Sequence, residues 1–303
     1  LYNMLAGIQR AIGDSRTPVV ILVIASIINI VLDIVLVVFI PMGVAGAAVA
    51  TVASQLIGGV VCLLYVSKHY EVLKMTREDF KINVPCIKRL LSMGLPMALQ
   101  TSITAIGSVI LQASVNSLGS TVVASITAGS RLYMFFACAY DAMGVTMSTY
   151  SGQNIGARKI DRIGQGVKAC NIVGILYSVL ALLIIVFLGK WMLLLFVDAG
   201  ETAIINSAYW YLVCSGLFMI PLTFVNVLRL TIQGMGYSRL ALFAGVFEMI
   251  ARGGVGLFLV PLFGFNAACF SGPIAWILAD SFLIPMYYPV SYTHLRAHET
   301  AAN

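Results

Sequence analysis

A carboxylate, an amide and a hydroxyl recur at helical spacing near the start of this sequence. Asn29 and Asp33 are four residues apart in an apolar segment, which places both on one face of a helix. Thr51 follows in the next apolar segment, about as far beyond the turn at Pro41 and Gly43 as Asp33 precedes it, so equal helical rises give equal depths. Such a set could bind a proton, or coordinate sodium through its oxygen atoms. The alternative is a hydrogen-bonded polar plug that fixes helix packing.

The position of Asp33 favours the ion-binding interpretation. A carboxylate at the middle of a lipid-embedded helix costs roughly 2.5–3.5 kcal/mol on insertion scales. Charged groups in such places commonly mark ion or proton pathways. The sequence predicts no other metal site than a sodium site at Asp33.

Other polar side chains interrupt later apolar segments. Glu248 and Arg252 are four residues apart, and this spacing predicts a structural ion pair within one helix. A second set is predicted to line a substrate pathway, although an interhelical hydrogen bond is the favoured interpretation for each amide. This set consists of Gln100, Gln112, Asn116, Arg131, Asp141, Asn226 and Asp280.

The hydrophobic composition indicates that these apolar segments are embedded in a membrane. Of the 303 residues 60% are hydrophobic and 10% charged, which excludes a soluble domain. Crossing a bilayer takes about 20 apolar residues in a helix. The sequence therefore predicts an all-α polytopic membrane protein with about eight transmembrane helices. They span residues 18–40, 44–67, 90–116, 122–148, 166–189, 204–228, 239–260 and 266–288.

The positive charges gather in alternate loops. Loops 68–89 and 156–168 are rich in Lys and Arg, whereas Lys190 is the only basic residue in the opposite loops. By the positive-inside rule, loops 68–89 and 156–168 are cytoplasmic in a multi-pass protein of the cell membrane. The net charge of +6 therefore indicates no nucleic-acid partner. The six cysteines show no paired spacing, and no catalytic or cofactor motif is present, so we expect neither an enzyme nor a cofactor.

Two short glycine motifs predict an internal repeat. Gly13-Asp14-Ser15-Arg16 opens one apolar segment and Gly236-Tyr237-Ser238-Arg239 opens another, 223 residues later. Each segment ends near a proline and a glycine, Pro41 with Gly43 and Pro261 with Gly264. Both segments run outward, which predicts a parallel repeat of six helices, with chance agreement as the alternative.

The repeat length predicts the domain organisation. Residues 1–72 would hold the end of helix four and helices five and six of an amino-terminal lobe, and 73–290 a complete six-helix lobe. We therefore expect a fragment that lacks the first four helices. Residues 291–303 resemble a peptide encoded when a reading frame runs into a sequencing adaptor. A non-native tail is expected there, and a genuine polar tail is the alternative.

Several ordered motifs resemble the multidrug and toxic compound extrusion (MATE) family. The runs 13–18, 29–33 and 42–51 resemble its fifth and sixth helices. Gly94-Leu95-Pro96 resembles the start of its seventh helix, and the run 152–158 resembles the loop after the eighth. The resemblance implies two six-helix lobes. It also implies a cation site of the amino-terminal lobe at Asn29, Asp33 and Thr51.

The resemblance implies a secondary antiporter that exports organic, cationic and amphipathic compounds in exchange for H+ or Na+. Residues 90–116 and 204–228 contain no Asp or Glu, which argues for coupling through the first lobe. The expected partners are small organic substrates and membrane lipids, and the expected state is a monomer. A lipid-linked saccharide flippase is the alternative. It is disfavoured because only Arg131 and Arg252 lie inside predicted spans, away from the residues at the span ends. A non-transporting membrane scaffold is the further alternative.

Overall fold

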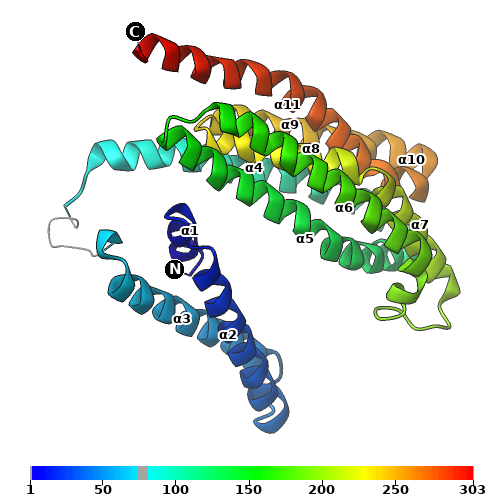
Figure 1. Cartoon of the computed structure of the whole chain (residues 1–303). Helices are drawn as coiled ribbons and strands as arrows, with labels where there is room; N and C mark the ends of the chain where they lie inside the picture. Colours follow the sequence, from blue (N-terminus) through cyan, green and yellow to red (C-terminus); the bar gives the residue numbers. More distant parts are fainter. Residues whose placement is uncertain (1, 74–80, 303) are drawn as a thin grey trace. The chain divides into compact units, whose positions relative to one another are not determined.

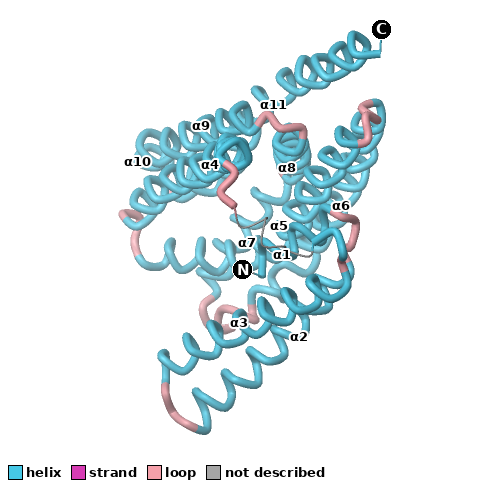
Figure 2. Tube along the Cα trace, turned by 90° about the vertical axis from the view of Figure 1, so that its left-hand side faces the viewer, coloured by secondary structure: helices cyan, strands magenta, loops and turns pink. Residues whose placement is uncertain are grey.

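The computed structural model describes residues 2–73 and 81–302, with side chains described for 2–71, 73 and 81–290. Within these ranges the chain is built of helices and connecting turns, without a strand (Figure 2). Seven of the described helices are long and apolar enough to cross a membrane, and a bent helix pair brings the number to eight. The predicted fold class, an all-α polytopic membrane protein, is confirmed.

The chain divides into two compact units, of which the first is Leu1–Val84. Its elements are α1 (Tyr2–Ala11), α2 (Arg16–Asp33), the π-helical η1 (Ile34–Phe39), α3 (Gly43–His69) and the 3-10 turn η2 (Glu71–Leu73) (Figure 1). Helix α3 packs along α2 and also contacts α1. The buried core of this unit is small and consists of Leu5, Ile21, Cys62 and Val66.

The second unit, Pro85–Asn303, contains the remaining helices. They are α4 (Val84–Asn116), α5 (Ser120–Gly156), α6 (Asp161–Leu193), α7 (Thr202–Leu217), α8 (Met219–Gly234), α9 (Ser238–Gly254), η3 (Val255–Leu259), α10 (Val260–Phe263) and α11 (Phe265–Ala302). Helix α5 contacts α6, α7 and α8, while α11 packs against α7, α8 and α9. The large side chains at these contacts, such as Tyr140, Leu212 and Leu283, are fully buried.

Small residues let the helices of the second unit approach closely. A Cβ atom on Gly234 of α8 would collide with the backbone of Ser148 in α5. At the crossing of α4 and α9, a Cβ on Gly107 would lie 2.8 Å from the Cα of Met249. Close contact through small residues is typical of helices that associate in lipid. These crossings hold α8 against α5 and α4 against α9, and α4, α8 and α9 carry the polar site described below.

One predicted span, 204–228, is broken in the structure. Helices α7 and α8 replace it, and they are bent by 54° at Phe218. Pro221 explains the break, because its nitrogen has no hydrogen to donate to the carbonyl oxygen one turn earlier. Helix α8 starts a new direction and continues to Gly234, six residues beyond the predicted end of the span.

The two glycine motifs form matching turns. Gly13 and Gly236 have φ values of +99° and +92°, while Gly43 and Gly264 have +58° and +59°. Side chains other than glycine rarely adopt this left-handed region. The backbone therefore repeats where the sequence predicts a repeat.

A second irregularity also recurs in both units. The π-helical segment Ile34–Phe39 precedes the turn at Gly43, and Val255–Leu259 precedes the turn at Gly264.

The predicted domain boundary at residues 72 and 73 adjoins residues 74–80, which lie outside the described residues. The predicted non-native tail 291–303 lies where no side chains are described.

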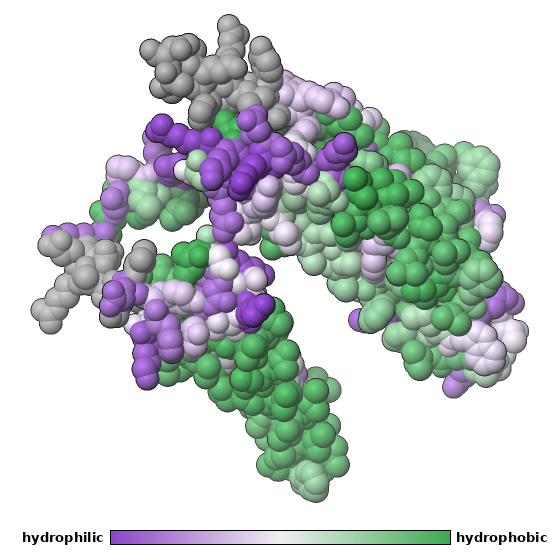
Figure 3. Space-filling view, in the orientation of Figure 1, coloured by the Kyte–Doolittle hydropathy of each residue, from purple (hydrophilic) through white to green (hydrophobic). Residues whose placement is uncertain are grey.

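Apolar side chains cover the visible outer surface of the helices, and hydrophilic ones gather near the helix ends (Figure 3). Exposed Leu, Ile, Val and Phe residues occur along nearly every helix, including Val109, Phe187 and Leu262. In a bilayer these side chains face lipid, and the backbone polar groups are satisfied inside each helix.

Candidate functional site

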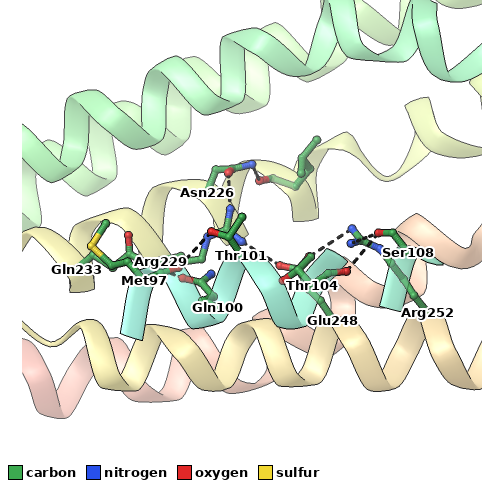
Figure 4. A network of polar contacts seen from close by, with 11 residues as sticks. Met97, Gln100, Thr101, Thr104, Ser108, Asn226, Arg229, Gln233, Glu248 and Arg252 are labelled. Atoms are coloured by element: carbon green, nitrogen blue, oxygen red, sulfur yellow. Dashed lines mark hydrogen bonds and ion pairs between the residues drawn. The ribbon is translucent and has the colours of Figure 1, made fainter. Parts of the chain in front are cut away.

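Two arginines and a glutamate form a charged triad inside the second unit (Figure 4). Nη1 of Arg229, in α8, lies 2.9 Å from Oε1 of Glu248, and Nη2 of Arg252 lies 3.2 Å from Oε2. The side chain of Glu248 is 5% exposed and each arginine side chain is 18% exposed. Each carboxylate oxygen is therefore paired with one guanidinium, and the triad carries one excess positive charge.

Neutral polar groups extend the triad along α4 and α8. Arg229 donates from Nη2 to Oδ1 of Asn226 at 2.9 Å, and Arg252 donates to Oγ of Ser108 at 3.3 Å. On the other side of Arg229, Gln233 donates to Oε1 of Gln100 at 2.6 Å. The network thus connects α4, α8 and α9, and such networks favour one arrangement of the helices that carry them.

The triad lines a cavity of about 490 Å³ within the second unit. Its wall combines charged side chains, Asp141 among them, with the hydroxyl groups of Thr101 and Thr104 and with apolar and aromatic side chains. A volume of this size, with a few convergent polar groups, is typical of small-molecule sites.

A second cavity, of about 330 Å³, adjoins the first. Arg252, Tyr133 and Trp276 line both cavities. The rings of Tyr133 and Trp276 are stacked, with centroids 5.9 Å apart and planes 16° from parallel. This aromatic pair and one guanidinium therefore lie between the two spaces.

Four of the residues predicted for a substrate pathway line these cavities. Gln100, Asp141 and Asn226 line the larger one and Gln112 the smaller one. Asn116 does not line either, and its Oδ1 accepts a hydrogen bond of 2.8 Å from Gln112.

Arg131 and Asp280 lie elsewhere in the second unit. Arg131 is exposed on α5, and Asp280 is buried in α11 with its Oδ1 lacking a hydrogen-bond partner among the described residues. Neither residue lines the two cavities.

The prediction that only Arg131 and Arg252 lie inside spans was wrong. Arg229 belongs to α8, and its side chain is mostly buried beside Glu248. The error came from treating 204–228 as one straight span, which assigned Arg229 to a cytoplasmic turn. After the break at Phe218, helix α8 continues to Gly234, so Arg229 lies within the helix.

In the first unit, Asn29 and Asp33 lie on α2, and Thr51 lies on the neighbouring α3. Nδ2 of Asn29 and Oδ1 of Asp33 are buried and have no hydrogen-bond partner among the described residues. Thr51 is exposed, and its hydroxyl donates to the carbonyl oxygen of Ala47 at 2.9 Å. No hydrogen bond joins these three side chains. A buried carboxylate oxygen without a partner could bind a proton or a sodium ion. Because the three side chains do not contact one another through hydrogen bonds, the cation site at Asn29, Asp33 and Thr51 stays a prediction.

The backbone changes directly after Asp33. Helix α2 ends there, and the π-helical segment Ile34–Phe39 follows. The backbone N–H of Ile40, the next residue, donates to the carbonyl oxygen of Val35 at 3.0 Å. Such wide turns inside helices are rare and often lie at functional sites. The equal rise of 1.5 Å per residue, assumed in matching the depths of Asp33 and Thr51, does not hold over this segment.

Comparison with known proteins decides the family. The family model MatE matches residues 96–258, which is more than half of the chain. This chain belongs to the MATE family. A curated relative, the probable multidrug resistance protein YpnP of Bacillus subtilis, is 27% identical over 212 residues, or 69% of this chain and 46% of the relative. The FAD transporter of Shewanella oneidensis is 28% identical over 161 residues, which cover 52% of this chain and 35% of that protein.

A solved structure shows the same fold. A MATE protein crystallised in complex with MaL6 matches 97% of this chain with a TM-score of 0.90, at 20% sequence identity. The match covers 67% of that protein's chain. The matched part of the present MATE chain covers 46% and 35% of the lengths of these two curated relatives.

Sequence reasoning missed several cavity residues of this MATE chain. Thr101, Thr104 and Ser108 recur at helical spacing on α4, and this polar stripe could have been found from the sequence. Tyr133 and Trp276 gave no such indication, because aromatic residues are common in membrane helices and their stacking depends on tertiary packing.

A carboxylate outside the spans fixes the start of α2 in this MATE chain. Oδ1 of Asp14 accepts hydrogen bonds from the backbone N–H groups of Arg16 at 3.0 Å and Thr17 at 3.1 Å, and Tyr70 donates its hydroxyl to Oδ2. Hydrogen bonds from the Thr17 side chain, from Tyr70 and from backbone N–H groups lower the pKa of Asp14 to about 2. The same contact with Asp14 raises the pKa of Tyr70 to about 12. The motif thereby joins the start of α2 to the end of α3.

This contact predicts a pH dependence of the stability of the first unit. Because the folded-state pKa of Asp14 is below its unfolded value near 3.9, its contribution is complete above about pH 5 and is lost as the pH falls towards 2. Asp14→Asn should be less stable than the parent at pH 6 by less than about 1 kcal/mol, since the site is exposed. The two proteins should become equally stable near pH 2. Thermal unfolding between pH 6 and 2 measures the difference, and parallel profiles would contradict the prediction.

Proposed function

We propose that this chain is part of a secondary antiporter that exports amphipathic organic compounds from the cell in exchange for protons or sodium ions. The family supports a transporter rather than an enzyme. The proposal includes a multi-pass monomer in the cell membrane, with loops 68–89 and 156–168 on the cytoplasmic side, because the basic residues gather there.

The observation that carries the coupling proposal is the buried, unpartnered oxygen of Asp33. Asp33 ends an apolar helix at a π-helical segment, beside an amide that also lacks a partner. Protonation would remove the charge of this carboxylate, and sodium would neutralise it with help from the carbonyl oxygen of Asn29. Either event changes which helix packing is more stable, which is the requirement for coupling an ion to alternating access.

The groups on the cavity wall give a better basis for the charge of the substrate than the sequence does. The expectation of cationic substrates came from the family resemblance and from abundant Met and aromatic residues, which are ordinary content of membrane helices. The cavity wall contains two guanidinium groups and two carboxylates, so it has no excess of negative charge. One relative is named as a transporter of FAD, a compound with phosphate groups. We therefore propose amphipathic organic substrates without a requirement for positive charge.

Arg229 also strengthens the alternative of a lipid-linked saccharide flippase. Such a protein needs a cationic cavity for a pyrophosphate group, and Arg229 adds a second arginine to the cavity wall. Movement of a lipid-linked saccharide between the two leaflets of a liposome would support the flippase, whereas accumulation of a soluble amphipathic compound would support the antiporter.

Reconstitution of the full-length transporter in liposomes tests the proposal. A pH gradient and a sodium gradient are imposed separately, and accumulation of a fluorescent amphipathic compound is followed. One coupled charge supports up to about 50-fold accumulation per 100 mV of potential. Accumulation that needs one of the two gradients supports the antiporter, and equal distribution under both contradicts it.

A further inference from the structure

The hydrogen-bonding groups of the larger cavity are unevenly distributed between donors and acceptors. Both oxygens of Glu248 are already paired with a guanidinium. Each guanidinium has five N–H donors, and only two nitrogens of each one take part in the contacts described. The contacts described use about four of the ten guanidinium N–H donors and two of about four acceptor sites of the carboxylate, so the triad has more donors than acceptors to spare.

The charges on the wall of the larger cavity also favour an anionic ligand. Arg229, Arg252 and Glu248 sum to one positive charge at a mostly buried position, where water screens it weakly. Asp141 is the other acid on the wall. It lies on α5, is exposed, and forms no ion pair among the described residues. Asp141 can balance the triad when the cavity contains only water, and it would compete with an anion that enters.

We infer that this cavity binds amphipathic compounds through an anionic group, a carboxylate or a phosphate, held by Arg229 and Arg252. Guanidinium groups bind these planar or branched anions through paired hydrogen bonds, which are stronger than those between neutral groups. The stacked rings of Tyr133 and Trp276 lie on the same wall and offer an apolar surface to the rest of the molecule. The inference names the substrate class for the transport proposed above and rests on that proposal for its role, but binding alone tests it.

Trp276 provides a spectroscopic probe inside the cavity. The chain has three tryptophans, and Trp191 and Trp210 are 73% and 47% exposed, whereas Trp276 is 5% exposed. In a Trp191→Phe, Trp210→Phe background, with tryptophans outside this chain also replaced, energy transfer from Trp276 to a dansyl group reports occupancy. Dansylglycine carries a carboxylate, dansylcadaverine an ammonium group and dansylamide no charge. The longer alkyl linker of dansylcadaverine favours its binding to an apolar surface, so tighter binding of dansylglycine would reflect its charge.

The full-length protein should bind dansylglycine about tenfold more tightly than dansylcadaverine. Arg229→Gln should weaken dansylglycine binding about tenfold and leave dansylamide unchanged. Arg239→Gln is the matched control, because this arginine is exposed at the start of α9 and does not line the cavity. Asp141→Asn should have the opposite effect and strengthen dansylglycine binding.

The Asp141 variant keeps the test decisive if Arg229→Gln does not fold, since Asp141 is exposed and unpaired among the described residues. Tighter binding of dansylcadaverine than of dansylglycine would overturn the inference, as would equal effects of Asp141→Asn on all three probes. Failure of ion-coupled transport would leave these binding results unchanged, so the two proposals fail separately.

Nanodiscs distinguish a lipid phosphate from a soluble anion. Dansylglycine binding is compared in phosphatidylcholine alone and in phosphatidylcholine with phosphatidylglycerol. The comparison is made in salt concentrated enough to screen the charge of the bilayer surface. Weaker binding in the presence of phosphatidylglycerol then identifies a lipid phosphate as an occupant, and equal binding identifies a soluble anion. Either result supports an anion site, provided that dansylglycine binds more tightly than dansylcadaverine.

Discussion

Asp33→Asn in the full-length transporter is expected to abolish ion-coupled efflux while leaving the amount of protein in the membrane unchanged. Asparagine has nearly the shape of aspartate but neither binds a proton at physiological pH nor carries a charge for sodium. Because Oδ1 of Asp33 has no partner among the described residues, the substitution breaks no hydrogen bond that the structure contains. The folded protein should therefore persist without its coupling. Removing a charge from an apolar helix should not impair insertion.

The measurement is substrate efflux from proteoliposomes under an imposed proton or sodium gradient. Asp161→Asn is the matched control, since Asp161 is exposed at the first residue of α6 and lies outside both candidate sites. Asp33→Glu should retain part of the coupling. Asn29→Ala and Thr51→Ala should shift the ion dependence if these residues share the site. Undiminished coupled efflux by Asp33→Asn would exclude coupling at this residue, and a scaffold without transport would show no ion-linked flux in any variant.

Glu248→Ala is expected to destabilise the second unit by about 3–5 kcal/mol, because it leaves Arg229 and Arg252 mostly buried without their shared carboxylate. Breaking a buried ion pair by removing one partner costs more than the pair contributes, since the remaining charge keeps its desolvation penalty. Here two guanidinium groups lose the same partner. Thermal unfolding in detergent measures the loss.

Glu201→Ala is a suitable control, because Glu201 is exposed immediately before α7. The double variant Glu248→Gln, Arg229→Gln should lose less stability than the two single variants together, since it removes the charge and its partner at once. A change below about 0.5 kcal/mol for Glu248→Ala would mean that water in the cavity solvates both arginines.

The sequence predicted the parts of the molecule that depend on local patterns. Eight apolar segments predict the spans because a helix in lipid must satisfy its own backbone. The four-residue spacing of Glu248 and Arg252 predicts their contact, and the structure has an ion pair of 3.2 Å there. Gly13 and Gly236 predict matching turns because few other residues adopt the backbone conformation found at both positions.

The parts that sequence reasoning missed depend on tertiary packing. Pro221 in the sequence allows a break in the span, but a proline in a membrane helix is often tolerated, as Pro96 is within α4. Only the bend of 54° shows that Arg229 lies in a helix beside Glu248. The stacking of Tyr133 on Trp276 joins helices α5 and α11, and no spacing rule connects residues so far apart in the chain.

The two copies of the repeat have matching turns, but each has its charged residue where the other has a neutral one. At the offset of the first glycine turn, Arg252 corresponds to Asn29, and Gly256 corresponds to Asp33. After duplication, one copy thus kept or gained an acid and the other a base. If the acid binds a proton and the base an anionic substrate, as proposed above, this divergence has an electrical consequence for the transport cycle. Exchange of one inward proton for one outward monovalent anion moves two charges in the same direction, so the membrane potential supplies about 4.6 kcal/mol per 100 mV. Exchange of the same proton for a monovalent cation would be electrically silent.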